Sequence, residues 1–67
     1  MSMAQAELQA LRLVVKGVKR AGGYICLLAT PEIRRATERC RLVGATEVEI
    51  RAAIEVAYCE DERGHHV

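Results

Sequence analysis

Gly44 separates two stretches whose apolar residues follow the spacing of an α-helix, and this pattern constrains the fold more than any other feature. Before Gly44, apolar or small side chains recur every three or four residues at Ile33, Ala36, Cys40 and Val43. After it, the same spacing recurs at Ile50, Ala53, Ile54 and Ala57. Glycine ends helices because it adopts a left-handed conformation without steric cost. The sequence therefore predicts two helices joined by a tight turn, over residues 31–43 and 46–61.

Both of these predicted helices begin with a capping signal. Thr30 precedes Pro31, so we expect the Thr30 hydroxyl to cap the first helix and Pro31 to take its first position, where a missing N–H costs nothing. Thr46 and Glu49 have the spacing of a capping box, in which each side chain accepts a hydrogen bond from the backbone N–H of the other residue.

A third helix is predicted at the N-terminus, over residues 3–21. Its apolar side chains are Leu8, Leu11, Val15 and Val18. Ser2 is placed to cap it, and Gly22 with Gly23 to end it. A second possibility stays open, because residues 13–15 favour strands and Gly17 weakens a helix by about 1 kcal/mol. It is a β-hairpin that pairs residues 12–19 with residues 24–29.

Length and composition predict self-association. A chain of 67 residues forms a single domain, residues 1–67, and a domain this small buries only about 60% of its unfolded surface. The chain has no Trp and no Phe, so its core is built from smaller side chains. We therefore expect an all-α fold, a small three-helix domain with a helix-turn-helix-like hairpin, that forms a homodimer. The predicted dimer seam consists of Leu8, Leu11, Val15 and Val18.

The hairpin also has a functional interpretation. Residues 36–55 resemble the helix-turn-helix of phage Cro-type repressors in the spacing of Cys40, Gly44, Ile50 and the pair Ala53 and Ile54. The resemblance implies a DNA-binding transcriptional regulator. The outward side of the second helix departs from it, because the carboxylates of Glu47, Glu49 and Glu55 repel phosphate and cannot donate to guanine. If nucleic acid binds, the better candidates are basic residues elsewhere, namely Arg12, Lys16, Lys19, Arg20, Arg34, Arg35 and Arg41.

The chain is basic at one end and acidic at the other. Residues 1–45 carry eight basic and three acidic side chains, and residues 46–67 carry two basic and six acidic ones. Such polarity steers charged partners. We expect a non-enzymatic protein-interaction module, a regulator or inhibitor that binds another protein and is encoded by a phage or mobile element. The residues assigned to the partner are Glu47, Val48, Glu49, Arg51, Glu55 and Tyr58, with the glutamates exposed and dispensable for folding.

Catalytic and metal-binding patterns are not recognisable. No phosphate-binding glycine loop or nucleophile motif occurs, and His65 and His66 lie at the C-terminal end. Together with Cys59, Glu60 and Asp61 they do not have the spacing of zinc ligands. We therefore expect no enzyme activity, metal or cofactor, and a frayed tail over residues 60–67.

The expected location is the cytoplasm. The longest apolar run, residues 24–29, is far shorter than the roughly 20 residues that cross a bilayer. The N-terminus lacks a basic segment followed by a long apolar one, so no signal peptide is predicted. An odd number of cysteines, Cys26, Cys40 and Cys59, is unusual for a secreted disulfide framework.

Overall fold

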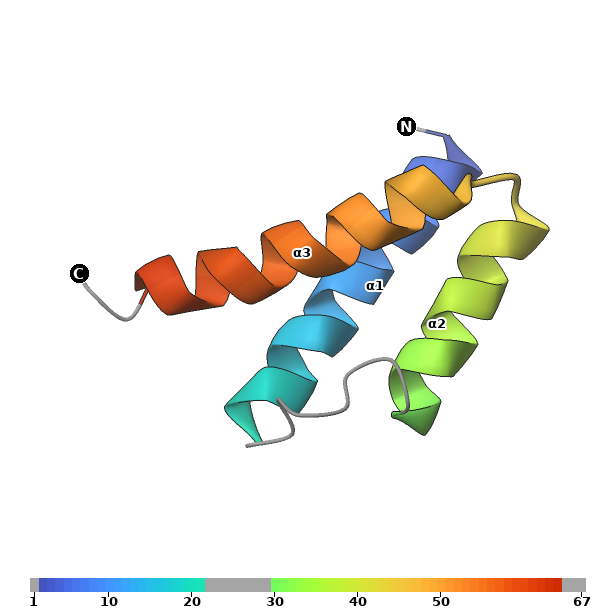
Figure 1. Ribbon diagram of the computed structural model, residues 1–67. Coiled ribbons are helices and arrows are strands. Elements are labelled where there is room, and N and C mark those ends of the chain that lie inside the picture. The colour runs from blue at the N-terminus through green and yellow to red at the C-terminus, as the bar shows by residue number, and fades with distance from the viewer. Residues whose placement is uncertain (1, 22–29, 65–67) are drawn as a thin grey trace.

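Three helices form the described part of the chain (Figure 1). The computed structural model describes the backbone of residues 2–21 and 30–64 and the side chains up to residue 59. The helices are α1 (Met3–Arg20), α2 (Pro31–Leu42) and α3 (Glu47–Gly64). No strand occurs among the described residues, so the all-α prediction is confirmed. The hairpin alternative is wrong, because residues 12–19 are helical; residues 24–29 lie outside the described residues.

Helix α1 owes its start to a side-chain cap and its position to a narrow apolar stripe. The N–H of Gln5 donates to Ser2 Oγ at 3.1 Å, which satisfies one of the donors that a helix N-terminus leaves unpaired. Leu11 and Val15 are fully buried, one turn apart. The helix ends at Arg20, with Ala21 as its C-cap. The predicted stop at Gly22 and Gly23 lies outside the described residues.

Helix α2 begins at Pro31, as predicted, with Thr30 in the N-cap position. The Thr30 side chain makes no capping hydrogen bond, so that part of the prediction is wrong. Proline at the first position explains why the start persists without it, since its fixed φ is already helical. Within α2, the Thr37 hydroxyl donates to the carbonyl of Arg34 at 2.8 Å, which satisfies a polar group that the fold buries.

The turn between α2 and α3 is a Schellman motif. The N–H of Ala45 donates to the carbonyl of Cys40, and that of Gly44 to the carbonyl of Arg41, both at 3.0 Å. Gly44 has a φ of 92°, the positive value predicted for it. The capping box is also confirmed, because the N–H of Glu49 donates to Thr46 Oγ1 at 3.1 Å and the N–H of Thr46 to Glu49 Oε1 at 2.8 Å.

Helix α3 runs three residues further than predicted. It extends to Gly64, so residues 60–64 belong to a helix and not to a frayed tail. The remaining tail, residues 65–67, lies outside the described residues.

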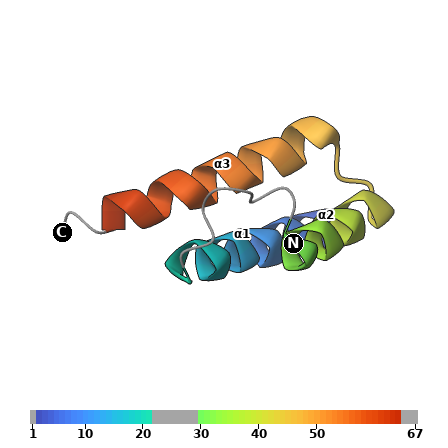
Figure 2. The ribbon, with the colours of Figure 1, turned by 60° about the horizontal axis from the view of Figure 1, so that its bottom comes forward.

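The core lies between one central helix and its two neighbours. Helix α1 packs against both α2 and α3, which touch each other little. Figure 2 shows α1 and α2 side by side in one layer and α3 across them in a second. The buried apolar side chains are Leu11, Val15, Ile33, Ala36, Cys40, Ala45, Ile50, Ala53 and Ala57. Four of these nine are alanines, so the core is thin, as the lack of Phe and Trp predicts.

No helix in the described residues combines the length and the apolar character that crossing a bilayer requires.

Candidate interaction surface on the third helix

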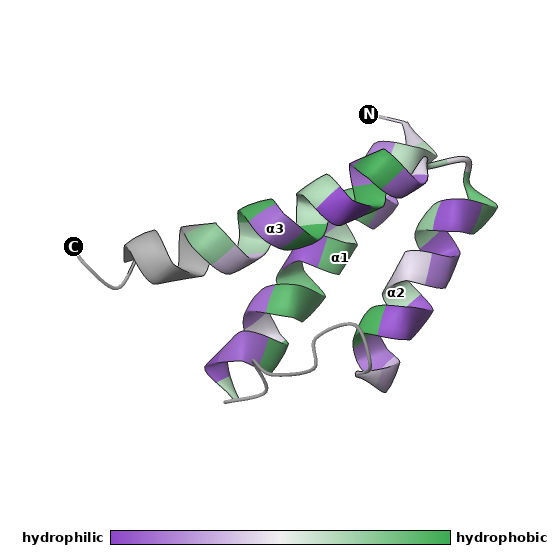
Figure 3. Cartoon of the chain, viewed as in Figure 1, coloured by the Kyte–Doolittle hydropathy of each residue, from purple (hydrophilic) through white to green (hydrophobic). Residues whose placement is uncertain are grey.

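Helix α3 is apolar on two sides. Its inner side packs on α1 through Ile50, Ala53 and Ala57. Its outer side carries a second set of apolar residues at helical spacing, Val48, Ala52, Val56 and Cys59, which we call the outer α3 stripe. All four are exposed, Val48 at 78% and Val56 at 44%. Figure 3 shows hydrophobic segments recurring along α3. This stripe has no cover from the described part of the chain.

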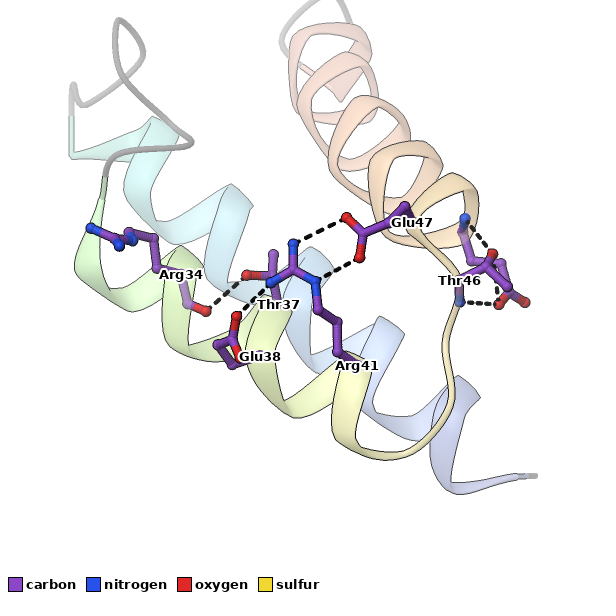
Figure 4. A network of polar contacts seen from close by, with 7 residues as sticks. Arg34, Thr37, Glu38, Arg41, Thr46 and Glu47 are labelled. Atoms are coloured by element: carbon purple, nitrogen blue, oxygen red, sulfur yellow. Dashed lines mark hydrogen bonds and ion pairs between the residues drawn. The ribbon is translucent and has the colours of Figure 1, made fainter.

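Glu47, at the start of α3, is held by an arginine of α2. Arg41 donates to both carboxylate oxygens of Glu47, from Nε at 2.6 Å and from a terminal nitrogen at 3.1 Å, and also donates to Glu38 (Figure 4). The hydrogen bond from Arg41 lowers the pKa of the Glu47 carboxyl. Glu47 is therefore exposed, as predicted. It also forms a bidentate ion pair that links α3 to α2.

Glu49 is also exposed and also engaged. One of its carboxylate oxygens accepts from the Thr46 backbone N–H and from the Thr46 hydroxyl, at 2.8 Å and 3.2 Å. These contacts close the first turn of α3 (Figure 4). Glu49 is therefore a member of the capping box that the sequence predicts, and not only an exposed charge.

Among the described side chains of α3, up to residue 59, Glu55 and Arg51 are the charged ones that do not take part in such contacts. Glu55 is exposed and makes no hydrogen bond or ion pair with the rest of the described chain. Arg51 is exposed one turn after Glu47 and helps to lower the pKa of that carboxyl. Both lie beside the outer α3 stripe, and their charges are accessible to a partner.

Tyr58 is shared with α1. The ammonium of Lys19 lies 3.9 Å from the centre of the Tyr58 ring and donates to the Tyr58 carbonyl at 2.7 Å. The ring is half-buried. This cation–π contact joins the end of α1 to α3. Tyr58 therefore offers a partner less apolar surface than an exposed tyrosine would. Val48, which is exposed, offers more than Tyr58 does.

Two grooves border α3. The first lies between α1 and α3, measures about 410 Å³ and is lined by Leu8, Arg12, Glu49, Ala52 and Val56, among others. It is continuous with the outer α3 stripe through Ala52 and Val56. The second, about 860 Å³, lies between α2 and α3. Its walls include residues from both predicted sets, namely Arg34 and Arg41 from the basic set and Glu47, Arg51 and Glu55 from the partner-binding set.

The basic residues predicted for nucleic acid are divided between α1 and α2. Arg12, Lys16, Lys19 and Arg20 lie on α1, where each already takes part in a polar or electrostatic contact. Arg41 is paired with Glu38 and Glu47. Arg34 and Arg35 are exposed on α2.

The predicted dimer seam lies largely inside the chain. Leu11 and Val15 are completely buried, and Leu8 and Val18 pack against the same core. Amphipathic periodicity identifies a buried face but does not say whether another helix of the same chain or a second chain buries it. Leu11 and Val15 therefore belong to the intramolecular core, and the homodimer stays a prediction that needs another surface.

The sequence reasoning missed Ala52, Val56 and Cys59 as surface residues. The signal was present, because they continue from Val48 at spacings of four, four and three.

No group of metal ligands occurs among the described residues. Comparison of the chain with protein-family models, with curated proteins and with solved structures finds no match.

Proposed function

We propose that this protein is a non-enzymatic interaction module that binds another protein through the outer side of α3. The single observation that carries the proposal is the outer α3 stripe, an apolar row on a helix whose inner side is already packed on the core. A regulator or inhibitor of this kind acts by occupying a surface of its partner. A protruding helix docks by laying its apolar row into a groove.

The charge of α3 indicates the chemistry of the partner. The helix contains six acidic and two basic residues in sequence, and Glu55 beside the stripe has no counter-ion among the described residues. A groove with an apolar floor and basic rims complements such a helix. In this arrangement Val48 supplies the anchor, and Glu55 contributes to the rate and specificity of association.

A photo-crosslinking side chain in place of Val48 tests the proposal. Irradiation in an extract of the organism that encodes the protein should link α3 to a basic protein, while the same group in place of Arg35, on α2, should not. Once that partner is purified, Val48→Asp should weaken its binding by about tenfold or more. Glu55→Lys should slow association, and more so at low salt.

Both substitutions should leave the fold intact, since Val48 and Glu55 are exposed. Arg35→Asp, another exposed charge change, is the matched control and should bind like the wild type. Unchanged affinity of Val48→Asp for the crosslinked partner would overturn the proposal.

A second candidate, a helix-turn-helix DNA-binding regulator, rests on the turn. Gly44 has positive φ, and Cys40, Ala45, Ile50 and Ala53 are buried around it, as in that motif. The outer side of α3 argues against it, since Arg51 is the only basic residue there up to residue 59. DNA binding would show as an affinity that falls steeply with salt and rises in Glu55→Lys.

A further inference from the structure

The far side of α1 carries a second uncovered apolar row. Met3, Ala6, Ala10, Leu13 and Gly17, which we call the outer α1 stripe, alternate at spacings of three and four residues. All five are exposed, Met3 at 72% and Leu13 at 69%. This is the heptad spacing that brings two helices together along a seam. It contains no charged residue.

The stripe lies on the side of α1 turned away from the core. Leu11 and Val15 mark the buried side of the same helix, and helical geometry places the stripe opposite to them. In Figure 2, α3 lies on one side only of the layer formed by α1 and α2. The described residues leave the other side of α1 open.

Gly17 is not explained by the packing of the single chain. Glycine is a poor helix former, and an added Cβ at Gly17 would meet no atom within 4 Å. The packing of the single chain therefore gives no reason for a glycine in this helix. A helix that approaches from outside does, because small residues let two backbones come close.

We propose that a second copy of this chain packs on the outer α1 stripe, with its own α1 antiparallel to the first. A two-fold axis at Ala10 sets Met3 of one copy against Gly17 of the other. It also sets Leu13 over the two alanines, Ala6 and Ala10, of the other copy. Each large side chain thus meets a small one, the condition for close packing.

A parallel pair lacks this match. It would set Met3 against Met3, Leu13 against Leu13 and Gly17 against Gly17, so that large side chains meet large ones and small residues meet small ones. The antiparallel pair also sets the N-terminal end of one helix dipole beside the C-terminal end of the other. The stripe is therefore complementary in size to a second copy of itself in the antiparallel direction and not in the parallel one.

Disulfide formation distinguishes the two directions. In a Cys26→Ser, Cys59→Ser background, Ala10→Cys should crosslink two copies under mild oxidation, because Ala10 lies on the two-fold axis. Gly17→Cys alone should not crosslink, but a mixture of Gly17→Cys and Met3→Cys chains should. Crosslinking of Gly17→Cys with itself would overturn the antiparallel arrangement.

Sedimentation tests the surface. The wild type should change from monomer to dimer as its concentration rises, and Leu13→Asp should raise the dimer Kd by tenfold or more. Val48→Asp, on the outer side of α3, is the matched control and should leave the dimer Kd unchanged. A wild type that stays monomeric at millimolar concentration, or a dimer lost in Val48→Asp and kept in Leu13→Asp, would overturn the proposal.

The stability of the monomer is read separately. Leu13 lies outside the core, so Leu13→Asp should unfold like the wild type in dilute solution. The proposal is independent of partner binding by α3, since Leu13 and Val48 lie on different helices.

Discussion

At the scale of the residue, two glycines have opposite roles. Gly44 has a φ of 92° and an open space around the position of a Cβ, so its replacement is costly through backbone strain alone. Gly17 lies inside α1 with equally open space, so its replacement improves the helix. We predict that Gly44→Ala lowers the free energy of unfolding by about 1–2 kcal/mol, and that Gly17→Ala raises it by about 1 kcal/mol.

Chemical denaturation in dilute solution measures both effects on the monomer. Each variant adds one methyl group, so the pair controls for size and hydrophobicity. Equal changes in the two variants would contradict the assignment of Gly44 to a left-handed turn.

Glu47 makes stability depend on pH at the same scale. Its pKa is lowered in the folded state by the hydrogen bond from Arg41, so folding favours the ionised carboxylate. The resulting stabilisation is fully present above the unfolded pKa of about 4.3. It is lost as the pH falls through the lower pKa of the folded protein. We predict that Glu47→Gln is less stable than the wild type near neutral pH, and that the difference shrinks in acid.

Denaturant titrations at neutral and acid pH test this dependence. Glu55→Gln is the matched control, because Glu55 is exposed on the same helix without a partner among the described residues. It should track the wild type at both pH values. A difference for Glu47→Gln that persists in acid would assign its effect to packing and not to charge.

At the scale of the element, the sequence predicted local motifs better than it predicted contacts between helices. Gly44, Thr46 and Glu49 lie within six consecutive residues, so their motif is encoded by the local sequence. Thr30 shows the limit of such signals, since proline at the next position already begins the helix and the hydroxyl makes no capping bond. The end of α3 was misplaced for a related reason, because polarity after residue 59 resembles a tail as much as an exposed helix.

The candidate sites were harder to predict than the helices. The charged residues of α3 were correctly placed on the surface, but their intramolecular partners depend on how α2 lies against α3. Arg41 reaches Glu47 across the turn, which a single-helix pattern does not show. Likewise, α1 and α3 each carry two apolar rows, and periodicity alone does not say which row enters the core.

At the scale of the whole molecule, charge is divided between the two layers. The helices α1 and α2 together contain eight basic and three acidic residues, and α3 contains two basic and six acidic ones. The sequence asymmetry thus becomes a polarity across the fold, since α3 alone forms the second layer (Figure 2). Attraction between oppositely charged layers favours their association, and the ion pair of Arg41 with Glu47 is one direct contact between them.

The thin core makes the whole fold sensitive to a single truncation, and Cys40 reports on it. Cys40 is fully buried, and burial raises the pKa of its thiol, so it should react with thiol reagents only when the fold opens. Leu11, also fully buried, should cost about 2–5 kcal/mol when truncated to alanine. In a Cys26→Ser, Cys59→Ser background in dilute solution, Leu11→Ala should therefore speed labelling of Cys40 by about thirtyfold or more.

Leu13→Ala removes the same atoms from an exposed position of the same helix and should leave the labelling rate unchanged. Because opening exposes the core in one step in a domain this small, the ratio of the two labelling rates measures how much of the stability depends on Leu11. Equal rates in the two variants would mean that Cys40 is reached by a local motion of α2, and that the three helices do not unfold as one unit.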